Sequence, residues 1–108
     1  MRKEIIQNKL VRDNIPQIII SQGNIPEIST LTKDEYRTEL KKKLQEEVTE
    51  FLESEEQEEI ADIMEVLDTI IDEYQYSREE IQNIKKVKKE KNGSFTKRIY
   101  LKNISMSN

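Results

Sequence analysis

The sequence predicts an all-α helical bundle with three main helices, a short N-terminal helix and a small terminal two-stranded β-ribbon. Two observations lead to this fold class. Apolar residues recur at helical spacing over residues 33–53 and 55–74. Three Ser or Thr residues each precede a Glu or Gln by three positions, which is the pattern of a helix-capping box. The three pairs are Thr32 with Glu35, Ser54 with Gln57, and Ser77 with Glu80.

A short helix is expected near the N-terminus. Asp13 or Asn14 can cap it, Pro16 lies in its first turn, and Gly23 ends it. The capping boxes then open the three main helices. We expect these over about residues 33–53, over 55–74, and from 78 to just before Gly93.

The β-ribbon is expected from two extended segments. The segments are residues 24–31 and residues 95–101 (Phe95-Thr96-Lys97-Arg98-Ile99-Tyr100-Leu101). Part of the first can pair with the second. The sequence shows no internal repeat and no low-complexity linker, so we expect one domain over residues 1–108.

Composition limits both the core and the chemistry. Charged residues make up 37% of the 108 residues and hydrophobic residues 34%, so a small chain has little apolar material for a core of its own. We therefore expect a homo-oligomer. The chain has no Cys and no His, which excludes disulfides, the usual zinc sites and Cys–His or Ser–His catalysis. Any metal would be held by oxygen, as Mg²⁺, Mn²⁺ and Ca²⁺ are.

The first residues do not look like a targeting signal. No long apolar stretch follows Arg2 and Lys3, and no run approaches the 18 apolar residues of a membrane span. We expect a cytoplasmic protein without a membrane partner.

The net charge of −4 conceals a strong asymmetry. Residues 1–45 carry a net charge of +3, residues 46–80 carry −14, and residues 81–108 carry +7. Like charges this dense oppose a compact state. One interpretation is a solvated acidic helix face beside basic ones. The other is an acidic cation site flanked by a basic strip, which a phosphate-bearing ligand and its metal would satisfy together.

A helical wheel directs several carboxylates toward the buried faces. On the 33–53 helix, Glu47 falls inside the apolar arc, Glu50 at its edge and Glu46 outside it. On the next helix, Glu59 falls inside the arc and Asp62 beside it. Each helix thus places one Glu inward with a second carboxylate three residues later.

The short loop at Ser54 makes the two helices antiparallel neighbours, so these carboxylates can converge. Four carboxylates in a partly buried site repel one another, and a divalent cation removes that conflict. The alternative is that Glu47 and Glu59 are edge residues whose carboxylates reach solvent. Asp68 is an outside candidate for the same site, and a structural hydrogen bond explains it equally well.

These acidic motifs resemble a known signature, E-E-x-x-E followed by E-x-x-D. Here the two parts are Glu46-Glu47-Val48-Thr49-Glu50 and Glu59-Ile60-Ala61-Asp62. In these two motifs the chain resembles the MazG-like and phosphoribosyl-ATP pyrophosphohydrolase-like enzymes. These are the all-α nucleoside triphosphate pyrophosphohydrolases. The segments 8–13 and 91–95 resemble the edges of one house-cleaning branch, so the resemblance covers about residues 8–101. Only residues 51–58 separate the motifs, a shorter gap than in many MazG-type members.

The resemblance implies Mg²⁺-dependent hydrolysis between the α and β phosphates of a nucleotide, with Mn²⁺ as a possible substitute. It implies that Glu46 positions or deprotonates the water, unless Glu46 is a further ligand. The implied metal ligands are Glu47, Glu50, Glu59 and Asp62. The residues implied to hold substrate phosphates are Lys9, Arg12, Lys89, Lys91, Lys97 and Arg98.

Other functions stay open at this point. Phosphoribosyl-ATP pyrophosphohydrolase of histidine biosynthesis shares the chemistry, but the terminal motifs favour the house-cleaning branch. A non-enzymatic acidic helical interaction module would explain the charge of residues 46–80 without chemistry. Nucleic-acid binding fits poorly, because the basic run at 85–98 lies beside an acidic block and lacks interleaved aromatic residues.

Overall fold

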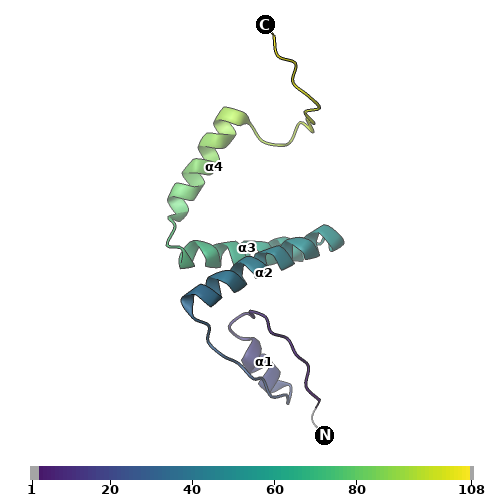
Figure 1. The fold of residues 1–108 in the computed structure, drawn as a ribbon, viewed down its shortest axis with the longest axis vertical. Coiled ribbons are helices and arrows are strands. Elements are labelled where there is room, and N and C mark those ends of the chain that lie inside the picture. Colours follow the sequence, from purple (N-terminus) through teal and green to yellow (C-terminus); the bar gives the residue numbers. More distant parts are fainter. Residues whose placement is uncertain (1–2, 108) are drawn as a thin grey trace. The chain divides into compact units, whose positions relative to one another are not determined.

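A computed structural model describes residues 3–107, and these residues form four α-helices and no strand (Figure 1). The all-α prediction is therefore confirmed. The chain divides into two compact units, one ending at Gln75 and the other beginning at Tyr76. Each unit is described below by itself, and the expectation of one domain over residues 1–108 stays a prediction.

The first unit begins with the short helix that the sequence predicts. Helix α1 spans Ile15–Ser21 and has Pro16 in its first turn. Asn14 occupies the N-cap position without a side-chain hydrogen bond to the helix. The helix ends where Gly23 adopts a φ of +83°, a left-handed conformation that glycine tolerates best.

Helix α2 spans Lys33–Ser54 and starts at a complete capping box. The Thr32 hydroxyl accepts from the Glu35 N–H at 3.3 Å, and the Thr32 N–H donates to Glu35 Oε1 at 2.9 Å. At the other end, Glu55 adopts a left-handed φ of 57° and donates its N–H to the Phe51 carbonyl. This residue turns the chain into the next helix.

Helix α3 spans Gln57–Glu73, and the capping box predicted at Ser54 and Gln57 is wrong. Ser54 is still the last residue of α2, and the N-cap of α3 is Glu56. Gln57 is therefore the first residue of α3 and not its third. The Ser54 hydroxyl instead accepts from the Glu56 N–H at 3.2 Å, within the turn itself.

Helices α2 and α3 pack against each other as the hairpin that the short loop predicts (Figure 1). Among the described residues, the buried hydrophobic side chains are Leu40 and Val66, so the core is as small as the composition suggested. Arg37 links α2 to the end of α3, at the end of the hairpin away from the turn. Its guanidinium lies 4.3 Å from the Tyr74 ring centre and 3.4 Å from a carboxylate oxygen of Glu73. This cation–π contact and ion pair fix the register of the two helices.

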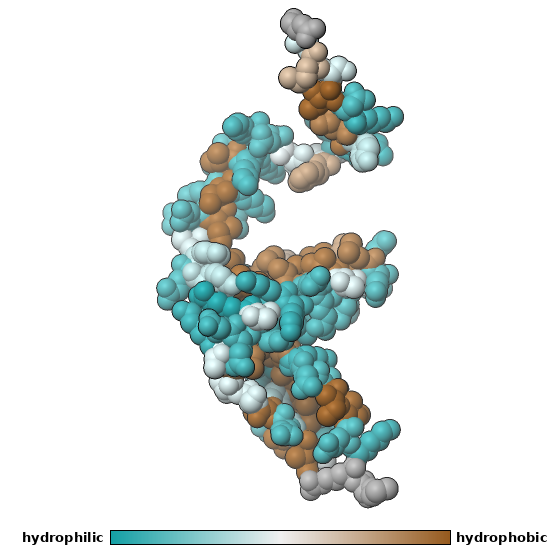
Figure 2. All heavy atoms as spheres, viewed as in Figure 1, coloured by the Kyte–Doolittle hydropathy of each residue, from teal (hydrophilic) through white to brown (hydrophobic). Residues whose placement is uncertain are grey.

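The second unit contains helix α4, Arg78–Asn92. The Ser77 hydroxyl caps it by accepting from the Glu80 N–H at 3.1 Å, and Gly93 follows its last turn with a φ of +83°. Ile84 and Val87 form an exposed apolar stripe on α4. Figure 2 shows apolar surface of this kind on α4 and on the hairpin.

The predicted β-ribbon is wrong for the described residues, because neither 24–31 nor 95–101 forms a strand. A turn at residues 96–97 and a left-handed φ of 57° at Arg98 interrupt the second segment. Pro26 lacks the N–H that a ladder needs in the first. An isolated two-stranded ribbon is marginal in water, and these local breaks are enough to prevent it.

Within residues 3–107, no helix has the length and the apolar character needed to cross a bilayer.

The capping box at α2 gives a first testable prediction. Thr32→Ala should lower the free energy of unfolding by about 1 kcal/mol, because it removes the hydroxyl that accepts from Glu35. Urea denaturation measures this loss. The matched control is Thr30→Ala, an exposed position outside the helix, which should change stability little. Equal effects of the two substitutions would show that the box does not stabilise α2.

Candidate metal centre

Five carboxylates gather where α2 and α3 pack together. Glu47, Glu59 and Asp62 each offer an oxygen, and these oxygens lie within 4.8 Å of one another. Glu46 and Glu50 form a second group of the same tightness with Glu47. Glu47 belongs to both groups and joins them into one cluster, which we call the carboxylate cluster.

Helical spacing explains how each carboxylate reaches this point. Glu47 and Glu50 are one turn apart on α2, and Glu59 and Asp62 are one turn apart on α3. Glu47 is only 7% exposed, as its place inside the apolar arc predicted. Glu59 and Asp62 are partly buried. The hairpin turn brings the two pairs face to face.

Two oxygens in the cluster are buried without a hydrogen-bond partner. They are Glu47 Oε2 on α2 and Glu59 Oε2 on α3. A buried polar atom left unsatisfied costs about 1–3 kcal/mol, so chains rarely keep one without a reason. Here the two orphaned atoms belong to facing helices and to the same three-residue group. A ligand that accepts electron pairs from both oxygens would explain them together.

The carboxylate cluster also shifts the pKa of its most buried member, Glu47. Burial raises the pKa of Glu47 above its usual value, and hydrogen bonding with Glu50 and the negative charges of Glu50 and Asp62 raise it further. The positive charge of Lys43 works in the opposite direction. Removing Glu47 from water and surrounding it with carboxylates thus favours its protonated form.

Two cations compensate part of the negative charge. Lys43 Nζ lies 3.5 Å from Oε1 of Glu46 and 3.5 Å from Oε1 of Glu47. Arg12 Nη2 donates to Asp62 Oδ1 at 2.8 Å, from the segment that precedes α1. Two positive side chains against five carboxylates leave the cluster with a surplus of negative charge.

Sequence reasoning missed Lys43. The signal was present, because Lys43 precedes Glu47 by four residues and such a spacing on a helix brings opposite charges together. The side chain is 19% exposed, so its ammonium group lies close to the buried face and not free in solvent.

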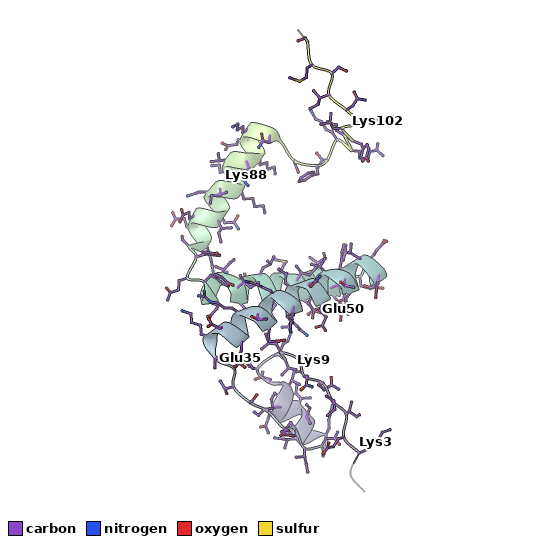
Figure 3. The ribbon with its side chains drawn as sticks, viewed as in Figure 1. Lys3, Lys9, Glu35, Glu50, Lys88 and Lys102 are labelled. Carbon is purple, nitrogen blue, oxygen red and sulfur yellow. The ribbon has the colours of Figure 1, made fainter. Side chains whose placement is uncertain are left out.

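The other predicted site residues lie elsewhere. Lys9 is exposed on the segment before α1, in the same unit as Glu50 (Figure 3). Asp68 belongs to neither carboxylate group among the described residues. The remaining predicted phosphate-binding residues all belong to the second unit, and their role stays a prediction. They are Lys89, Lys91, Lys97 and Arg98.

The cluster has the chemistry of a hard-cation site. All its donors are carboxylate oxygens, which suit Mg²⁺, Mn²⁺ or Ca²⁺ and not the softer metals. A divalent ion would offset the surplus negative charge and give the orphaned oxygens of Glu47 and Glu59 a partner. These residues therefore fit the metal that the sequence motif implies.

The raised pKa of Glu47 predicts a specific pH dependence of stability. A carboxyl whose pKa is higher in the folded state than its usual 4.5 stabilises the fold while protonated, and this contribution is lost as the pH rises through the raised pKa. Glu47→Gln removes the ionisation and supplies an amide donor. Without divalent ions, it should be about 1–3 kcal/mol more stable than the parent chain at pH 7.

Denaturation curves between pH 4 and pH 8 in a chelator measure this difference, which should shrink toward pH 4. The control is Glu65→Gln, an exposed carboxylate of α3 outside the cluster, which should follow the parent profile. If Glu47→Gln runs parallel to the parent chain at every pH, Glu47 is not the strained group.

Comparison with known proteins adds little to this description. No family model matches the chain. A Mycolicibacterium smegmatis protein described as uncharacterized is 52% identical over 42 residues, a stretch that covers 39% of this chain and 43% of the relative. No solved structure matches.

Proposed function

We propose that the protein is a Mg²⁺-dependent nucleoside triphosphate pyrophosphohydrolase. It would cleave between the α and β phosphates and release a nucleoside monophosphate and pyrophosphate, as a house-cleaning enzyme for non-canonical nucleotides. The supporting observation is the pair of buried, unpartnered oxygens, Glu47 Oε2 and Glu59 Oε2, on facing helices. We propose a cytoplasmic location for this activity.

The proposed roles combine the resemblance of the acidic motifs with the positions of the side chains. Glu47, Glu50, Glu59 and Asp62 would hold the metal. A bound Mg²⁺ neutralises phosphate charge and lowers the pKa of a coordinated water. Glu46 is 41% exposed beside these ligands, and from there it would orient the attacking water and accept its proton.

Positive side chains complete the proposed site. Phosphoryl chemistry depends on positioning and charge stabilisation more than on covalent help from the protein. The Arg12 guanidinium lies at the edge of the cluster, 58% exposed, and its planar group suits bidentate contact with phosphate oxygens. Lys43 pairs with Glu46 and Glu47, where it would hold the two carboxylates in place.

The test of this proposal is pyrophosphate release from a panel of canonical and modified nucleoside triphosphates, with phosphoribosyl-ATP included. We expect Mg²⁺-dependent turnover of at least one nucleoside triphosphate. Glu50→Gln and Asp62→Asn should each lower the rate by at least about a hundredfold while the protein stays folded, because each removes a metal ligand.

Glu65→Gln is the control for these variants and should keep the parent rate. If phosphoribosyl-ATP is the substrate that is hydrolysed and no nucleoside triphosphate is, the result would support the histidine-pathway function instead. A folded sample that turns over no nucleotide and binds neither Mg²⁺ nor Mn²⁺ in calorimetry would support the interaction module instead.

We also propose that the active form is a homo-oligomer built on the hairpin. Among the described residues, the buried hydrophobic side chains are Leu40 and Val66, so the hairpin has little core of its own. Exposed large apolar side chains recur at helical spacing on each helix of the hairpin, and together we call them the apolar stripe. They are Val48 and Leu52 on α2 and Ile60, Met64 and Leu67 on α3.

A second copy suits this stripe because the stripe runs along both helices of the hairpin. Two hairpins packed stripe to stripe would form a four-helix bundle and give each copy the core it lacks. On the helical wheel, Leu52 lies on the opposite side of α2 from Glu50, and Met64 on the opposite side of α3 from Asp62. The bundle would therefore leave the carboxylate cluster accessible.

Leu52→Lys tests this interface, because Leu52 is 69% exposed in one copy and belongs to the stripe. Light scattering should give the parent chain a mass of at least two copies and shift the variant toward 12.9 kDa. The control, Ile84→Lys, places the same charge on the exposed apolar stripe of α4 and should leave the mass unchanged. A monomeric parent chain at micromolar concentration would contradict the interface.

A further inference from the structure

The ion pair between Arg12 and Asp62 joins two parts of the first unit that are far apart in sequence. Arg12 Nη2 lies 2.8 Å from Asp62 Oδ1, and 50 residues separate them along the chain. The Arg12 carbonyl accepts from the Ile15 N–H at 3.1 Å, which ties its backbone to the start of α1. The backbone of Arg12 is thus held beside α1, while its side chain is 58% exposed.

Asp62 is the point at which this pair meets the carboxylate cluster. Its carboxylate lies within 4.8 Å of ligand oxygens of Glu47 and Glu59, so it belongs to the group that would hold a divalent cation. The Arg12 guanidinium and a divalent cation would therefore compete for the Asp62 carboxylate. Two positive groups this close also repel each other.

Charge explains why Arg12 pairs with Asp62. The cluster holds five carboxylates, and Lys43 alone leaves it strongly negative. Arg12 supplies one further positive charge at the edge of the cluster, where both partners are partly exposed, 58% for Arg12 and 40% for Asp62. An exposed ion pair of this kind is weak and easily exchanged. A divalent cation supplies two charges at the cluster and makes the guanidinium unnecessary there.

We propose that Arg12 is a displaceable cation. It neutralises Asp62 while the cluster is free of metal, a divalent cation releases it, and the released guanidinium binds substrate phosphate. This inference rests on the proposed function, because it requires that the cluster binds a divalent cation. It adds an order of events in which metal binding frees the residue that recognises the substrate.

Such an exchange has a signature that a purely structural ion pair lacks. Removing Arg12 should strengthen binding of the metal alone, since its competitor for Asp62 is gone, and should weaken binding of the nucleotide. A structural pair that merely held Asp62 in place would weaken metal binding when removed. The two roles therefore predict opposite signs for the change in metal affinity.

The test is calorimetric titration of Mn²⁺ alone into the full chain and into Arg12→Gln. We expect the variant to bind Mn²⁺ about two- to fivefold more tightly, as the loss of a weak competing pair implies. Lys33→Gln is the matched control, because it removes one positive charge from an exposed position at the start of α2. Its Mn²⁺ affinity should stay within about 1.5-fold of the parent value. A melting temperature for Arg12→Gln close to that of the parent chain shows that it is folded.

A second readout follows the guanidinium directly. In protein labelled with ¹⁵N-arginine, saturating Mg²⁺ should shift the Nε–Hε signal that is missing from Arg12→Gln, and should leave the Arg37 signal in place because Arg37 is held by Glu73 and Tyr74. A nucleotide KM raised at least tenfold in Arg12→Gln would complete the expected result.

The outcomes separate this inference from the proposed function. If the parent chain binds no Mn²⁺, both fail. If the parent chain binds Mn²⁺ but Arg12→Gln binds it equally or more weakly, and the Arg12 signal does not move with Mg²⁺, the metal site stands and the exchange is overturned.

Discussion

The rest of the structure depends on one electrostatic conflict, the burial of carboxylate oxygens from two helices at a common point. Glu47 on α2 and Glu59 on α3 each keep an oxygen that is out of contact with water and has no hydrogen-bond partner. Burial and neighbouring negative charges raise the pKa of Glu47, so its charged form is disfavoured at this point. A divalent cation bound at this point would offset the repulsion between these carboxylates.

The hairpin of α2 and α3 both places these carboxylates together and holds them in position. Arg37 holds the open end by contacting Glu73 and Tyr74, while Glu55 makes the turn at the other end. Contacts at both ends thus support the register that places Glu47 near Glu59. The core of the hairpin is small, because positions that would otherwise be apolar carry carboxylates, and the apolar stripe of the hairpin stays exposed.

Local signals in the sequence were sufficient to predict the start of α2 and the burial of Glu47. The α2 start at Thr32 and Glu35 depends on residues three positions apart, and the burial of Glu47 follows from helical periodicity, so both could be predicted. The start of α3 could not, because the left-handed turn at Glu55 and not the Ser54 hydroxyl determines it. The prediction of a β-ribbon was wrong because a strand needs a second strand to pair with, as well as an extended sequence pattern. The contact of Arg12 with Asp62 spans 50 residues, and only the folded chain reveals it.

The most direct measurement is the anomalous scattering of a crystal grown with Mn²⁺ and a non-hydrolysable nucleotide. The account predicts a peak between α2 and α3 within coordination distance of the now unpartnered oxygens of Glu47 and Glu59, with nucleotide phosphate beside it. A crystal in which Mn²⁺ is absent from that point, while those two carboxylates remain buried and face each other without it, would contradict the account.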